Sequence, residues 1–331
     1  MKLVLVNDNL VGEVLANPIY TENGMLFFNK GNVISETVIA RLKKMGVTTL
    51  YIEDCNDELN LQEVLPAPIK LKAVKELKAV FEEIKKREYI NEKRVVEIIE
   101  ILTENINLSE NATMINNLVQ SDDVSQMAVH SLDVTLLSLM VGIRKRYDEE
   151  KLVRLGIAAL LHDIGKLFSN DITHVKKGQE LMKRNPAIMS TTYMAVYYMY
   201  EREDGKGLFG IEGKKVHEFA KILGICNEYI NSINNNNGEE AILPHVAVEK
   251  ITVEAVDKFG EDTYKDFMQS VYCYPNGLQV KLNNGQTAVV TMQNSGANTR
   301  PTLAIDTGDG FKFCNLTDGE NLTLFIEEVI M

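Results

Sequence analysis

This 331-residue chain lacks a long basic block and a long apolar run. Its net charge is −12, and the densest basic groups, at residues 85–87 and 144–146, are typical of solvated helix ends. Binding to DNA or RNA through many phosphate contacts is therefore not expected, although a small anionic nucleotide can still bind in a local positive pocket. The apolar start at residues 3–6 is too short for a signal peptide, and no run of 18 apolar residues predicts a membrane span.

Cysteine is scarce. Cys55, Cys226, Cys273 and Cys314 lie far apart in the sequence, and none forms a CxxC pair. A reduced, cytoplasmic protein without a cysteine zinc site is the simplest interpretation. The composition, 45% hydrophobic and 25% charged, is that of a soluble globular protein, and the length suggests two or three domains.

Hydrophobic periodicity divides the chain into three predicted parts, and the expected fold class is mainly α. Residues 1–65 combine short strand patterns with one helix capped by Ser35, which predicts a small α+β accessory module. Residues 66–270 follow a helical period. Residues 271–331 alternate apolar and polar residues around the turn at 283–285, which predicts a small antiparallel β module. Helices are expected over about residues 71–84, 92–105, 122–146 and 152–161, with Ser121 as a candidate cap of the third.

Histidine is also rare, at five residues, and His162 stands next to Asp163 directly after the apolar run at 158–161. This places the pair at the end of a buried helix, where neither side chain can stay without a polar partner. A divalent metal such as zinc, manganese or iron would supply that partner. Hydrogen bonding at the helix end is the alternative. His217 and His245 match no motif and are interpreted as surface or structural residues.

The longer phrase around the pair resembles a known family. LLHDIGK at 160–166, with His130 thirty-two residues before the histidine, resembles the HD superfamily of metal-dependent phosphohydrolases. YEREDGKGLF at 200–209 resembles the HHExxDGxGYP signature of the HD-GYP class, and HVKKG at 174–178 resembles its intermediate HxxxG. Residues 220–227 resemble the helix that carries the last metal aspartate of that class. Both flanking modules also resemble pieces found around HD-GYP domains.

The resemblance implies a helical domain that binds two or three metals. In that class the metals activate water to attack a phosphodiester of the bacterial second messenger cyclic di-GMP or a related cyclic dinucleotide. The matching metal-ligand positions are His130, His162, Asp163 and His174. Lys166 matches the lysine that meets a substrate phosphate, which makes Asp163 and Lys166 the candidate catalytic residues.

The chain departs from the class at positions that hold metal. Gln126 replaces a glutamate, Met199 and Tyr200 replace paired histidines, and Asn227 replaces the last metal aspartate. Thioether, phenol and amide groups are poor substitutes for imidazole and carboxylate. Three interpretations stay open: a degenerate signalling protein with little or no phosphodiesterase activity, a phosphohydrolase with a reduced metal site, and an interaction scaffold. A protein partner would contact the loop at 204–207.

Overall fold

The computed structural model describes the whole chain apart from residues 22, 54–61, 111, 115–117, 120–121, 170, 235–240, 309 and 331 and the side chains of 113 and 119. The described α-helices are α1 (Glu36–Lys44), α2 (Ala67–Arg87), α3 (Glu92–Asn105), α4 (Asp123–Arg144), α5 (Glu149–Leu160), α6 (His174–Lys183), α7 (Ser190–Tyr197), α8 (Glu218–Asn234), α9 (Pro244–Phe259) and α10 (Glu261–Met268). Short 3-10 helices are η1 (Asp8–Leu10), η2 (Ile164–Leu167), η3 (Gly213–Lys215) and η4 (Gly319–Asn321).

The strands are short. They are β1 (Lys2–Leu5), β2 (Ile19–Thr21), β3 (Leu26–Phe28), β4 (Thr49–Ile52), β5 (Gln62–Glu63), β6 (Ala112–Thr113), β7 (Leu118–Val119), β8 (Gln279–Leu282), β9 (Thr287–Met292), β10 (Thr302–Asp306), β11 (Phe311–Asn315) and β12 (Ile326–Val329). The last five form one antiparallel sheet in the order β11-β10-β9-β8-β12.

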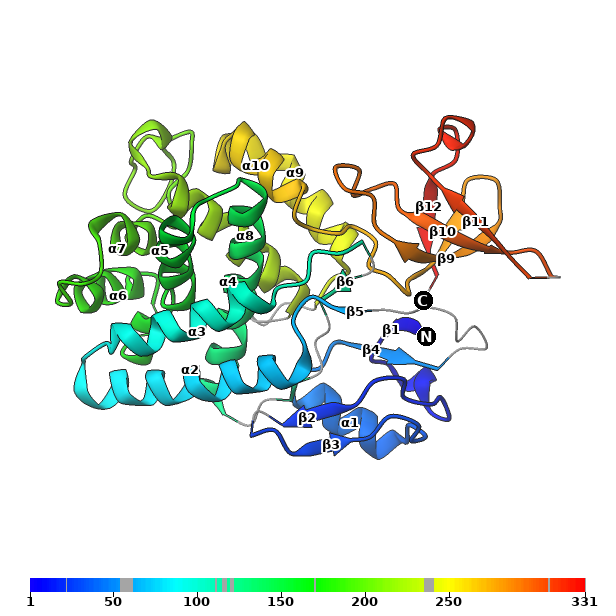
Figure 1. The fold of residues 1–331 in the computed structure, drawn as a ribbon, viewed down its shortest axis with the longest axis horizontal. Helices are drawn as coiled ribbons and strands as arrows, with labels where there is room; N and C mark the ends of the chain where they lie inside the picture. The colour runs from blue at the N-terminus through cyan, green and yellow to red at the C-terminus, as the bar shows by residue number, and fades with distance from the viewer. Residues whose placement is uncertain are drawn as a thin grey trace.

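Helices α2 to α10 fill one side of the molecule, and the two small modules lie on the other (Figure 1). The N-terminal module consists of α1 with the antiparallel pair β1 and β4 and the small sheet β3-β2-β7. The C-terminal module is the five-stranded sheet. The predicted fold class, mainly α with flanking α+β and antiparallel β modules, is therefore confirmed.

The two flanking modules share a hydrophobic cluster, although they lie at opposite ends of the sequence. Leu3 and Tyr51 pack in that cluster with residues of the C-terminal sheet. The Leu3 backbone amide donates to the Gly277 carbonyl at 3.0 Å, and the Tyr51 hydroxyl donates to the Asn276 carbonyl at 3.0 Å. The division at residues 65 and 270 stays a prediction. Residues 54–61, shortly before the first boundary, lie outside the described residues, and α2 begins at Ala67 rather than near the expected residue 71.

Helix α4 lies at the centre of the helical side and packs against α2, α5 and α8. By length and composition it could cross a membrane, with a mean hydropathy of 1.4 over 18 residues. However, 83% of that window is buried inside the fold, as in the core helix of a globular domain. Its apolar character is thus explained by packing on all sides.

The first turn of α4 is fixed by Asp122, while the predicted cap Ser121 lies outside the described residues. Asp122 Oδ1 accepts hydrogen bonds from the Ser125 backbone amide at 2.8 Å and from its hydroxyl at 3.0 Å. The Lys78 ammonium lies 2.7 Å from Oδ2 and lowers the pKa of Asp122 to about 2. The capping carboxylate therefore stays charged at neutral pH.

Substituting Asp122→Ala should lower the free energy of unfolding by about 1 kcal/mol, because an N-terminal amide of α4 loses its acceptor. Asp123→Ala is the matched control. Asp123 is also an acidic residue of the first turn, but it is not the N-cap residue, so its loss should change stability by less than about 0.5 kcal/mol. Denaturant unfolding of both variants measures the difference. Equal effects would contradict the capping role.

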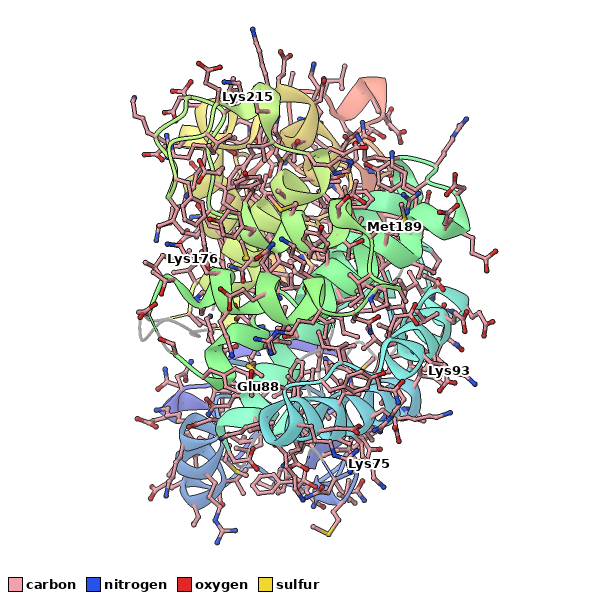
Figure 2. The ribbon with its side chains drawn as sticks, turned by 90° about the vertical axis from the view of Figure 1, so that its left-hand side faces the viewer. Lys75, Glu88, Lys93, Lys176, Met189 and Lys215 are labelled. Carbon is pink, nitrogen blue, oxygen red and sulfur yellow. The ribbon has the colours of Figure 1, made fainter. Side chains whose placement is uncertain are left out.

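The turn after α2 helps to position α6, the helix that begins at His174. Glu88 ends α2 with a left-handed φ of 49°. Its Oε2 lies 2.9 Å from the Lys177 ammonium and 3.1 Å from the Arg184 guanidinium. Figure 2 shows Glu88 on this face of the molecule, below Lys176 of α6.

Candidate metal centre

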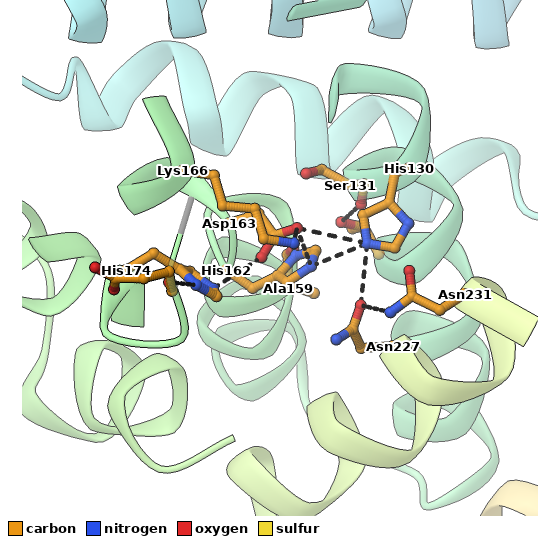
Figure 3. Close-up of polar contacts among 11 residues, drawn as sticks. His130, Ser131, Ala159, His162, Asp163, Lys166, His174, Asn227 and Asn231 are labelled. Atoms are coloured by element: carbon orange, nitrogen blue, oxygen red, sulfur yellow. Dashed lines mark hydrogen bonds and ion pairs between the residues drawn. The ribbon is translucent and has the colours of Figure 1, made fainter. Parts of the chain in front are cut away.

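Helices α4 and α5 bring three of the four predicted ligands together in the core (Figure 3). His130 lies on α4, and His162 and Asp163 follow the end of α5. All three are buried. His130 Nε2 lies 3.3 Å from His162 Nε2 and 3.6 Å from Asp163 Oδ2, and His162 Nε2 lies 3.3 Å from the same oxygen. Their ligand atoms all lie within 4.8 Å of one another, and we call these three residues the HD cluster.

The protonation states of these groups suit a cation. His162 Nδ1 lies 2.8 Å from the Ala159 carbonyl, and donation there leaves the lone pair of Nε2 facing the cluster. Burial lowers the pKa of His130 to about 3, so its imidazole is neutral. Burial opposes ionisation of Asp163, but the nearby His162 and Lys166 hold the pKa of that carboxyl well below its usual range. The imidazole nitrogens of His130 and His162 and the Asp163 carboxylate form a donor set for a divalent metal such as zinc, manganese or iron.

His174 contacts the cluster from the other side of Asp163. Its Nε2 lies 3.2 Å from Asp163 Oδ1, and its Nδ1 lies 2.9 Å from the Asp171 carbonyl. His174 Nε2 and Asp163 Oδ1 thus face each other inside the core, and this contact also helps to lower the pKa of Asp163. His174 therefore contacts Asp163 but lies outside the HD cluster.

Lys166 links the cluster to an open cleft. Its ammonium lies 2.7 Å from Asp163 Oδ2, and its side chain is one-third exposed. The cleft has a volume of about 660 Å³, and its walls include Lys85 of α2, Gln126, His130, Asp163 and Lys166. Gln126 thus lies beside the cluster, as its motif position predicts, and Lys85 adds a second positive charge that the sequence alone did not indicate.

The two replaced ligands, Tyr200 and Asn227, also lie at the cluster. Asn227 Oδ1 lies 3.0 Å from His130 Nε2, and Asn231 Nδ2 donates to the same oxygen at 3.2 Å. The Tyr200 ring meets His174 edge-on, with 5.9 Å between ring centroids. Burial and the Asp163 carboxylate raise the pKa of Tyr200, so the phenol stays neutral. Two uncharged groups therefore occupy positions at which the class has charged or basic ligands.

Sequence reasoning missed the contributions of Asn231 and Glu201. Asn231 follows Asn227 by one helical turn, a spacing that puts both on one face of α8. The Glu201 carboxylate accepts hydrogen bonds from the backbone amides of Phe209 at 2.5 Å and Ile211 at 2.7 Å, which fixes the loop after α7. Met199 is buried in the hydrophobic core.

Comparisons with known proteins agree with this geometry. Residues 127–257 match the family described as HD domain. The chain is 22% identical over 355 residues to "Cyclic di-GMP phosphodiesterase PA4108" of Pseudomonas aeruginosa, and the alignment covers 92% of this chain and 83% of the relative. The solved structure titled "Bd1817, a HDG"Y"P protein from Bdellovibrio bacteriovorus" matches with a TM-score of 0.47 and 14% identity, over 80% of this chain and 98% of that one. The HD match contains all four predicted ligands and the loop at 200–209, so the chain contains an HD domain and is similar in sequence to a cyclic di-GMP phosphodiesterase.

Proposed function

We propose that the protein binds one divalent metal ion and a cyclic dinucleotide at the HD cluster, and that it hydrolyses the dinucleotide slowly or not at all. The observation that carries this proposal is the neutral pair Tyr200 and Asn227 at the cluster. Adjacent cations need bridging or flanking anions to offset their mutual repulsion. Asp163 is the one carboxylate within the group of three, so the donor set favours a single ion.

The cleft supports a phosphate-containing ligand. Its volume of about 660 Å³ lies within the range of small-molecule sites. Lys85 and Lys166 line it, and an ammonium group is a good partner for a phosphate oxygen. A bound divalent metal would polarise a phosphoryl oxygen and make water more acidic. Lys166 would contact the phosphate. The Nδ1 atoms of His162 and His174 would keep these rings oriented through their contacts with the Ala159 and Asp171 carbonyls.

The proposal includes a role in bacterial cytoplasmic signalling, with the loop at 204–207 as the surface for a protein partner. Arg202 supports that loop, because its guanidinium makes two contacts of 3.0 Å with Asp204 and one of 3.0 Å with Glu254. A loop held in one conformation loses little entropy on binding.

Elemental mass spectrometry of protein purified without chelators should find about one iron, manganese or zinc per chain. His162→Ala should remove most of it, because it deletes one of the three clustered donors. His245→Ala is the matched control, since His245 stacks on Tyr274 away from the cluster. Calorimetry should then show binding of cyclic di-GMP with little turnover when manganese is present.

The same measurements separate the alternatives. Efficient turnover that His162→Ala abolishes would contradict slow hydrolysis and favour a phosphohydrolase with a reduced metal site. Absence of both metal and nucleotide binding would leave the interaction scaffold.

A further inference from the structure

A buried ion pair lies one helical turn beyond His130 on α4. Lys70 of α2 is 6% exposed and Asp133 of α4 is 3% exposed, with 3.6 Å between Lys70 Nζ and Asp133 Oδ1. Charged side chains are almost never buried to this extent without a partner, because their removal from water is costly. Burying such a pair is weak evidence for stability, and apolar residues of the same size would often do as well. Its place next to the metal centre therefore suggests another role.

The ion pair continues a row of polar side chains that joins α4 to α8. Asn227, Asn231 and Asn234 are spaced four and three residues apart on α8 and so share one face. At one end Asn227 Oδ1 meets His130 Nε2 at 3.0 Å, and at the other Asn234 Nδ2 donates to Asp133 Oδ2 at 3.2 Å. We call this row the polar seam; it consists of Lys70, His130, Asp133, Asn227, Asn231 and Asn234.

The far end of the polar seam faces the N-terminal module. Lys70, Asp133 and Asn234 line a cavity of about 90 Å³ together with Leu50 and Tyr51 of β4. Asp133 Oδ1 has no hydrogen-bond partner among the described residues, and the cavity has room for bridging water. The N-terminal module thus shields the ion pair from bulk solvent, which strengthens the attraction between its charges.

We propose that Asp133 is a positioning residue for the metal centre. Through Asn234 it holds α8 at the distance from α4 at which Asn227 Oδ1 meets His130 Nε2. Lys70 supplies the opposite charge that allows this carboxylate to be buried, and the N-terminal module separates the pair from bulk solvent. The inference rests on the proposed function only for its metal-binding readout, because the contact between His130 and Asn227 exists without a metal.

Asp133→Asn tests the inference, because it keeps the size of the side chain and removes its charge. In the metal-free full-length protein, nitrogen-15 spectra of the histidine side chains should show a changed His130 Nε2 resonance. The affinity for Mn²⁺, measured by calorimetry, should fall at least about tenfold, which is typical for groups that orient metal ligands. Asp266→Asn is the control, because it breaks a partly buried ion pair with Lys145, the residue that follows the C-terminal end of α4. It should lower Tm without changing either readout.

Unchanged His130 spectra and Mn²⁺ affinity in folded Asp133→Asn protein would overturn the inference. If that variant does not fold, the double variant Lys70→Met, Asp133→Leu replaces the pair by apolar residues of similar size. Wild-type Mn²⁺ affinity in the double variant would overturn the inference equally. Failure of the wild-type protein to bind Mn²⁺ would contradict the proposed function alone, and the spectra of the metal-free variants would then decide the role of Asp133.

Discussion

Tyr200→His combined with Asn227→Asp should raise the metal content from about one to about two ions per chain and increase cyclic di-GMP hydrolysis at least about tenfold. Both side chains already lie at the cluster, Tyr200 against His174 and Asn227 against His130. The double variant adds an imidazole beside His174, whose Nε2 lies 3.2 Å from Asp163 Oδ1, and so provides a further metal donor on that side of the carboxylate. It also adds a second carboxylate, which would offset the repulsion between two adjacent cations.

Elemental mass spectrometry and hydrolysis assays with manganese or iron(II) measure this effect. Ser232→Asp is the control, because it adds the same charge to α8 five residues beyond Asn227, about 140° around the helix axis from that residue. It should leave metal content and hydrolysis unchanged. A double variant that gains neither metal nor activity would show that the neutral residues at 200 and 227 are not what limits the site.

Much of the fold follows from local pattern. The apolar spacing in 92–105 predicted α3 at its observed bounds, because Asn91 caps the helix and one face is continuously apolar. The alternation around the turn at 283–285 likewise predicted an antiparallel β module, in which β8 and β9 pair across that turn. By contrast, β12 was not predicted. Its pairing with β8 joins segments more than forty residues apart, and a four-residue strand without a fully buried side chain leaves little periodic signal.

The candidate site also has a part that the sequence predicted and a part that it did not. The motif around His162 and Asp163 identified the cluster because metal ligands at fixed spacing are visible in the sequence, and the structure brings His130 and His174 to that pair. The polar seam could not be predicted from the sequence. Lys70 and Asp133 are sixty-three residues apart, and each alone has the pattern of an ordinary helical charge. Only the packing of α2 against α4 makes them a pair.

Gly165→Ala should be the most damaging single substitution near the site. A Cβ at residue 165 would lie 1.9 Å from the backbone oxygen of His174 and 2.7 Å from its carbonyl carbon. Because the obstacle is backbone, the segments η2 and α6 would have to separate, which would move His174 away from Asp163. We expect a loss of about 3 kcal/mol or more in unfolding free energy, at the upper end for overpacking, and weaker metal retention.

Gly178→Ala, also at the contact between η2 and α6, should not destabilise the protein. A Cβ there would lie 3.5 Å from Val196 and 3.6 Å from Ile164, both ordinary contacts with side chains. Gly178 lies inside α6, where alanine is favoured over glycine by up to about 1 kcal/mol, so this variant should match or exceed wild-type stability. Denaturant unfolding of both variants, with metal analysis of the folded protein, tests the pair. A Gly165→Ala protein as stable as Gly178→Ala would mean that η2 and α6 can separate freely, and that the position of His174 is not set by their close approach.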